Sequence, residues 1–82
     1  MPSKMFYSSI GAEFLRICRA TSTFQDALTS TTSLITRMIK QGANKRRLEG
    51  TVVKVIHRHR VVFNKYGITD EEMVGELQGV WE

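Results

Sequence analysis

The sequence predicts an all-α fold, a small bundle of three to four short helices that contains an αα-hairpin of the helix-turn-helix kind. Apolar residues recur at helical spacing in three successive stretches of the chain. Residues that favour helix ends, Thr and Asn before a helix and Gly after it, stand between these stretches. Eighty-two residues, of which 41% are hydrophobic, suffice for one small domain with a small core.

The first helix is predicted over residues 9–20. Ile10, Phe14, Ile17 and Cys18 recur at the spacing of one helix face. Because free cysteine is usually buried and inert, we expect Cys18 to be a small core residue. Three hydroxyl residues at 21–23 then interrupt the pattern, which indicates the end of this helix.

A second helix is expected to begin after Thr23, since Thr23 and Asp26 form a helix-start signature. One apolar stripe runs along it, made of Phe24, Ala27, Leu28, Thr31, Leu34, Ile35 and Met38. The opposite face is rich in Ser and Thr, which have mediocre helix propensity, so packing of the stripe must stabilise the helix. Gly42 is a natural C-terminal stop.

A third helix should start after Asn44, a good N-cap, and include Leu48, Val52, Val55, Ile56, His59, Val62 and Phe63. These apolar residues have helical spacing. Residues 51–56, however, are rich in β-branched side chains, and Gly50 is a poor residue for a helix interior. Because the alternation that a strand requires fails at 52–62, we favour a helix over a strand for 51–63.

A short fourth helix is predicted over residues 70–78. Gly67 closes the preceding element, and Thr69 with Glu72 is a capping pair. Acidic residues in the first turn suit the helix dipole. The apolar residues Val80 and Trp81 either dock on the body or fray with the chain end.

Charge divides the chain into a basic module at 1–69 and an acidic helix and tail at 70–82. The first part has all twelve Lys and Arg residues and three acidic ones, a net charge of +9, whereas the second has a net charge of −5. Within 37–65, nine basic residues stand against one acidic residue. Such a concentration of charge predicts contact with the phosphates of nucleic acid, although a merely solvated face has the same composition.

No motif of a catalytic site is found. The chain lacks a nucleophile elbow, a phosphate-binding glycine loop and carboxylates paired at catalytic spacing, so we expect no enzyme activity and no cofactor. His57 and His59 point about 200° apart on a helix, which argues against a metal site. The single cysteine suggests an intracellular protein, and no apolar run is long enough for a membrane span.

The order of residues over about 6–66 resembles the segment that follows the palm in animal reverse transcriptases of Penelope-type retroelements. The resemblance rests on Phe6-Tyr7-Ser8, Arg16-Ile17-Cys18-Arg19, Thr21-Ser22, Phe24, Leu34, Met38, Lys40-Gln41-Gly42, Leu48 and His57-Arg58-His59. It implies a helical, thumb-like or helix-turn-helix extension that holds a template–primer duplex beside a polymerase palm domain. The chain differs from the family at Ala43, where a bulky aromatic residue is frequent, and at Phe6, where proline is common. The palm aspartates are absent, so the resemblance implies a fragment without polymerase activity.

The resulting hypothesis is a non-catalytic module that clamps the phosphate backbone of an RNA–DNA hybrid or of duplex DNA. The residues predicted to bind nucleic acid are Arg16, Arg19, Lys45, Arg46, Arg47, Lys54, Arg58 and Arg60. Two alternatives are a stand-alone helix-turn-helix DNA-binding regulator, which predicts a dimer with sequence preference, and a protein-interaction module, which predicts weak binding of nucleic acid.

Overall fold

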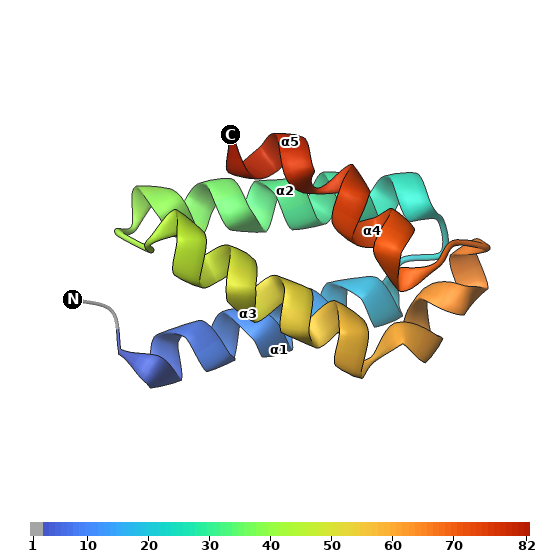
Figure 1. Cartoon of the computed structure of the whole chain (residues 1–82), viewed down its shortest axis with the longest axis horizontal. Coiled ribbons are helices and arrows are strands. Elements are labelled where there is room, and N and C mark those ends of the chain that lie inside the picture. The colour runs from blue at the N-terminus through green and yellow to red at the C-terminus, as the bar shows by residue number, and fades with distance from the viewer. Residues whose placement is uncertain (1–2) are drawn as a thin grey trace.

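Three long helices and three shorter ones make up the fold (Figure 1). The computed structural model describes residues 3–82. The elements are α1 (Lys4–Ala20), α2 (Phe24–Lys40), α3 (Lys45–Arg58), the 3₁₀ helix η1 (Arg60–Tyr66), α4 (Asp70–Glu76) and α5 (Gln78–Trp81). Over the described range there is no strand, so the predicted all-α fold is confirmed.

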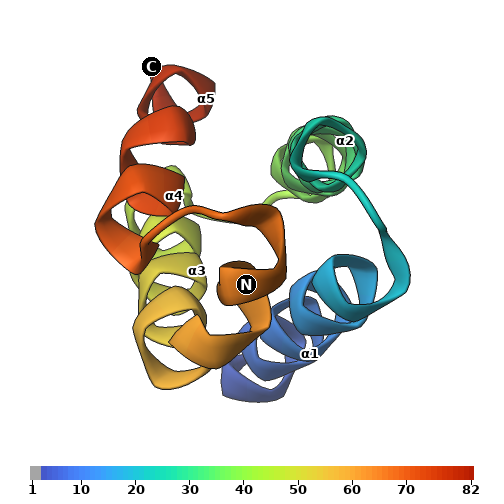
Figure 2. The same ribbon diagram turned by 90° about the vertical axis from the view of Figure 1, so that its right-hand side faces the viewer.

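The helices form two layers. Helices α1 and α3 run side by side in the same direction, and α2, which connects them in the sequence, runs in the opposite direction (Figure 1). Figure 2 shows α2 above α1, and α4 and α5 above α3. No helix within residues 3–82 has both the length and the apolar character needed to cross a bilayer.

Helix α1 begins five residues earlier than the predicted start at residue 9. The side chain of Ser3 accepts a hydrogen bond from the backbone N–H of Phe6, which caps the first turn. Tyr7 is buried and extends the apolar stripe of Ile10 and Phe14 by one turn. The predicted start was wrong because the cap at Ser3 and the buried ring of Tyr7 extend the helix by more than a turn before Ile10.

The turn between α2 and α3 follows the predicted boundaries. Thr23 caps α2, and the helix ends before Gly42, which has φ of 98°. Gly42 donates a backbone hydrogen bond to Ile39 and Ala43 donates one to Met38, both at 3.0 Å, the pattern of a Schellman cap. Asn44 then caps α3 by accepting a hydrogen bond from Arg47.

Helix α3 confirms the helical interpretation of the β-branched stretch, but it ends at Arg58 instead of continuing through 63. After His59 the chain changes direction and tightens into η1. This bend places the Phe63 ring beside the Phe14 ring, with centroids 6.3 Å apart, in the middle of the core. A tertiary contact therefore ends the helix, which the periodicity of 51–63 did not predict.

Element η1 also closes the C-terminal end of α1. The hydroxyl of Tyr66 lies 2.8 Å from the hydroxyl of Thr21 and within hydrogen-bond distance of the backbone carbonyls of Cys18 and Thr21, between which its single proton is shared. Lys65 donates to the carbonyl of Arg19 at 3.1 Å. These bonds satisfy carbonyl groups that a helix end leaves without partners.

The C-terminal segment contributes to the same core as the long helices. The predicted helix over 70–78 is interrupted, since α4 ends at Glu76 and α5 starts at Gln78. Met73 and Leu77 are fully or almost fully buried, and Trp81 is half-buried against the core, so this end of the chain docks. The complete buried cluster consists of Tyr7, Ile10, Phe14, Cys18, Leu34, Ile35, Ala43, Leu48, Val52, Ile56, Phe63, Met73 and Leu77.

Candidate nucleic-acid interface

An open groove of about 700 Å³ lies between α1 and α3. We call it the basic groove, and its walls are one flank of each helix. The lining residues are Lys4, Tyr7, Ser8, Gly11, Ala12 and Leu15 from α1, and Arg47, Gly50, Thr51, Lys54, Val55 and Arg58 from α3, followed by His59.

Small residues let the two walls approach each other. A Cβ atom at Gly11 would lie 3.2 Å from a methyl group of Val55 and 3.3 Å from that of Thr51, so glycine fits this contact best. Gly50 and Ala12 add little bulk on either side. Glycine at position 11 therefore allows the close packing of α1 against α3 beside the groove.

Four side chains of permanent positive charge line the groove, and none of the described lining residues is acidic. Arg47, Lys54 and Arg58 are separated by seven and four residues, which places them on one flank of α3. Lys4 adds a cation from α1. All four residues are exposed. A row of cations of this kind suits the phosphates along one strand of a nucleic acid.

Arg47 is positioned by α1. Its guanidinium carbon lies 4.5 Å from the centroid of the Tyr7 ring, within the range of a cation–π contact. The Tyr7 side chain is only 4% exposed, and its hydroxyl accepts a hydrogen bond of 2.9 Å from the backbone N–H of Asn44. The start of α3 is thus bound to α1 at the end of the groove.

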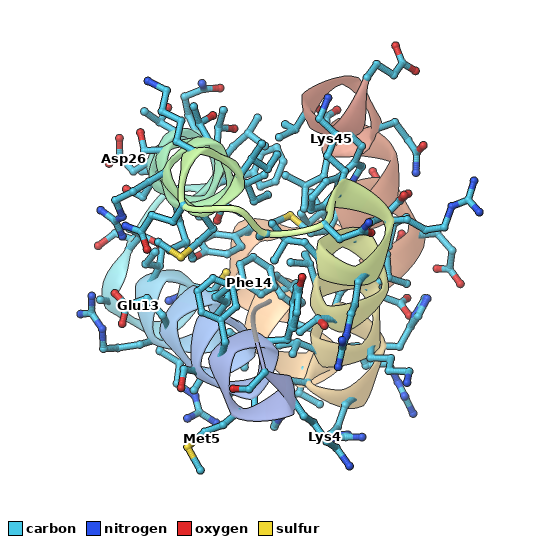
Figure 3. The ribbon with its side chains drawn as sticks, turned by 90° about the vertical axis from the view of Figure 1, so that its left-hand side faces the viewer. Lys4, Met5, Glu13, Phe14, Asp26 and Lys45 are labelled. Carbon is cyan, nitrogen blue, oxygen red and sulfur yellow. The ribbon has the colours of Figure 1, made fainter. Side chains whose placement is uncertain are left out.

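The first turns of α1 and α3 lie at the same end of the molecule, where Lys4 and Lys45 are labelled in Figure 3. Neither first turn holds an acidic residue, and α3 opens with three cations in succession. Positive charge at a helix N-terminus opposes the helix dipole and lowers stability. A contribution to helix stability therefore does not explain the cations in the first turn of α3.

Of the eight predicted binding residues, the structure places Arg47, Lys54 and Arg58 together in the groove. Lys45 and Arg46 are exposed on the first turn of α3, outside the lining. Arg19 is exposed near the other end of α1 and does not line the groove either.

Two further predicted residues have partners within the chain. Arg16 forms an ion pair with Glu13, and this hydrogen bond lowers the pKa of Glu13. Arg60 donates a hydrogen bond of 3.2 Å to the carbonyl of His57.

Sequence reasoning missed three residues of the site, namely Lys4, Tyr7 and His59. Lys4 lay before the predicted start of the first helix, so its place on the groove flank was not visible. Tyr7 precedes Gly11 by four residues, and this helical spacing with a small residue was the signal available for a close helix contact. The sequence favours a basic-face or packing role over a metal site for His59, without indicating that it lines a groove with α1.

His57 points elsewhere. Its Nδ1 atom lies 2.6 Å from a carboxylate oxygen of Asp70, the first residue of α4. This hydrogen bond lowers the pKa of Asp70. The pair joins the end of α3 to the start of α4. In the described part of the chain, no three His, Cys, Asp or Glu side chains gather as metal ligands would.

Comparison of the chain with protein-family models, with curated proteins and with solved structures finds no match. The residues of the basic groove are therefore the basis for inferring a function.

Proposed function

We propose that the chain is a non-catalytic module that binds the phosphate backbone of nucleic acid in the basic groove. The observation that carries this proposal is the lining of the groove, which holds four cations and no acidic residue. The net charge of +9 over residues 1–69 supports it, because a positive field attracts a polyanion from a distance.

The lining favours contact with phosphates over contact with bases. It contains no Asn, Gln, Asp or Glu side chain, so that apart from Arg and Lys only Ser8 and Thr51 belong to the residue types that commonly contact base edges. Of its two aromatic rings, that of Tyr7 is buried and faces Arg47, and the imidazole of His59 is half-buried, so the groove offers little free surface for base stacking. We therefore expect little dependence of the affinity on base sequence.

The resemblance to the thumb-side segment of a reverse transcriptase suggests a specific setting. In that setting the ligand is a template–primer duplex, either an RNA–DNA hybrid or duplex DNA, and a polymerase palm domain is the protein partner. The basic groove is compatible with this setting because its cations can contact the phosphate backbone of the duplex without hydrogen bonds to the bases.

The proposal is tested by fluorescence anisotropy with a hybrid duplex, a DNA duplex and a single strand of equal length, across a salt series. The groove variant is K54Q/R58Q. Its matched control, R37Q/K40Q, removes one Arg and one Lys from exposed positions on α2, outside the basic groove. For duplex DNA, we expect the slope of log affinity against log salt to become shallower by about 1.8 in the groove variant, two phosphate contacts, and to change much less in the control.

Two results would contradict the proposal. One is absence of binding at low salt by a sample that circular dichroism shows to be folded, which would favour a protein-interaction module. The other is an equal loss of affinity in the groove variant and in the control, which would mean that the total charge and not the groove determines binding. A marked preference among duplex sequences, with a dimeric protein, would instead favour a stand-alone regulator.

A further inference from the structure

We infer that Arg47 is the residue that fixes the position of a phosphate in the basic groove, and that Tyr7 is the residue that positions Arg47. This inference rests on the proposed function and adds a division of roles among the four cations. Arg47 is held in place and determines the position of the nucleic-acid backbone. Lys4, Lys54 and Arg58 contribute positive charge on mobile side chains.

Arg47 is fixed at both ends of its side chain. At the backbone, its N–H donates a 3.0 Å hydrogen bond to the Asn44 side chain, and the backbone N–H of Asn44 donates to the Tyr7 hydroxyl. At the tip, its guanidinium lies on the Tyr7 ring, with 4.5 Å between the guanidinium carbon and the ring centroid. One buried tyrosine therefore contacts both the start of α3 and the guanidinium of Arg47.

The other three cations of the groove have no comparable support. Within residues 3–82, Lys4, Lys54 and Arg58 make no side-chain hydrogen bond, ion pair or aromatic contact. Each must lose side-chain freedom when it binds a ligand, which reduces its contribution to affinity. Arg47 has already lost part of this freedom in the free protein.

The orientation of Arg47 suits a phosphate. Its guanidinium carbon lies over the ring, while the side chain as a whole is exposed. A planar fork with free N–H groups can donate two parallel hydrogen bonds to two oxygens of one phosphate. Lysine cannot fully replace arginine here, because its ammonium is a point charge that does not donate as a planar fork.

Conservative substitutions separate the two roles. We expect Arg47→Lys to weaken binding of duplex DNA about tenfold, nearly as much as Arg47→Gln, because the charge remains but the fork is lost. We expect Arg58→Lys in the same groove to weaken binding less than Arg47→Lys does, because a mobile charge is conserved there. The matched control is Arg37→Lys, at an exposed position of α2 outside the groove, which should bind within about twofold of the wild type. All are measured by anisotropy at one fixed salt concentration.

Tyr7 is tested by two variants and a double-mutant cycle. Tyr7→Phe keeps the ring and loses the hydrogen bond to Asn44, so it should lower the melting temperature but bind within about twofold of the wild type. Tyr7→Leu removes the ring and should weaken binding about fivefold. In the Arg47→Gln background the same Tyr7→Leu change should have no further effect on affinity, which a merely structural role would not predict.

The outcomes distinguish this inference from the proposed function. If the wild type binds and K54Q/R58Q weakens binding, but Arg47→Lys binds as tightly as the wild type, the special role of Arg47 is wrong and the groove remains the site. If the losses of affinity caused by Tyr7→Leu and Arg47→Gln are fully additive in the double variant, Tyr7 does not position Arg47. Circular dichroism of each variant at the temperature of the binding measurement ensures that only folded protein is compared.

Discussion

Cys18 illustrates at the scale of one residue how burial determines chemistry. The side chain is fully buried in the core, and burial raises the pKa of its thiol to about 11. The thiolate, which is the reactive form, is therefore disfavoured in the folded protein. The expectation that Cys18 is a core residue is confirmed.

A pH dependence of stability follows from the raised pKa. Below pH 9 the thiol is protonated in both states, whereas between pH 9 and 11 it ionises in the unfolded chain first, so stability decreases as the pH rises through this window. We expect a loss of about 1 kcal/mol by pH 10 that is absent from Cys18→Ala. Urea unfolding of both proteins at pH 8 and pH 10 measures it.

Identical pH dependence in the wild type and in Cys18→Ala would show that other groups cause the loss. As an independent readout, a thiol reagent at pH 8 should label native Cys18 far more slowly than it labels the urea-unfolded chain.

At the scale of elements, the first turn of α3 shows stability and the proposed function in conflict. Lys45, Arg46 and Arg47 stand where the helix dipole favours negative charge, and no acidic residue compensates them within that turn. By contrast, α4 begins with Asp70, Glu71 and Glu72 and a complete capping box.

Reversing the charges at the start of α3 should therefore stabilise the protein. We expect Lys45→Glu with Arg46→Glu to raise the free energy of unfolding by about 1 kcal/mol at low salt and less at high salt. The same variant should bind nucleic acid more weakly, because it reduces the positive field beside the groove. Thermal unfolding at two salt concentrations, with anisotropy at one, measures both effects, and an unchanged or lower melting temperature would contradict this account of the turn.

The elements themselves were largely predictable from sequence, because local chemistry determines them. Thr23 and Asn44 cap the helices that they were expected to cap, and Gly42 ends α2 in a left-handed conformation. The predicted helix bounds were wrong where tertiary contacts determine the end of a helix. The end of α3 depends on where Phe63 meets Phe14, and these two residues are distant in the sequence.

The candidate site was less predictable than the fold, for the same reason. Sequence reasoning finds cations but not which of them face one another across two helices. Arg47, Lys54 and Arg58 share a groove with Lys4 because Gly11 allows α1 and α3 to approach closely. Arg16, predicted with them, forms an ion pair with Glu13 on the surface of α1.

At the scale of the whole molecule, the acidic C-terminal segment is part of the folding unit. Met73 and Leu77 are buried in the same cluster as Phe14, and α4 packs on both α3 and η1. Loss of two large core side chains costs about 4 kcal/mol or more, comparable to the whole stability of a domain of this size.

Deletion of residues 70–82 should therefore leave a chain that does not fold, although it removes five negative charges and no predicted binding residue. Far-ultraviolet circular dichroism and a thermal scan measure the result. As a control, replacing the exposed Glu71, Glu72 and Glu76 by Gln removes charge without removing buried side chains, and this variant should stay folded. A truncated chain with a cooperative melting transition would contradict the assignment of α4 to the core.

The bonds that close the end of α1 also constrain the order in which the chain acquires structure during synthesis. Lys65 and Tyr66 reach carbonyls at positions 18–21, more than forty residues earlier. Until the ribosome has released η1, the last turn of α1 lacks these partners and remains open to water. These carbonyls at the end of the first helix therefore gain their side-chain partners only after the third helix has been synthesised.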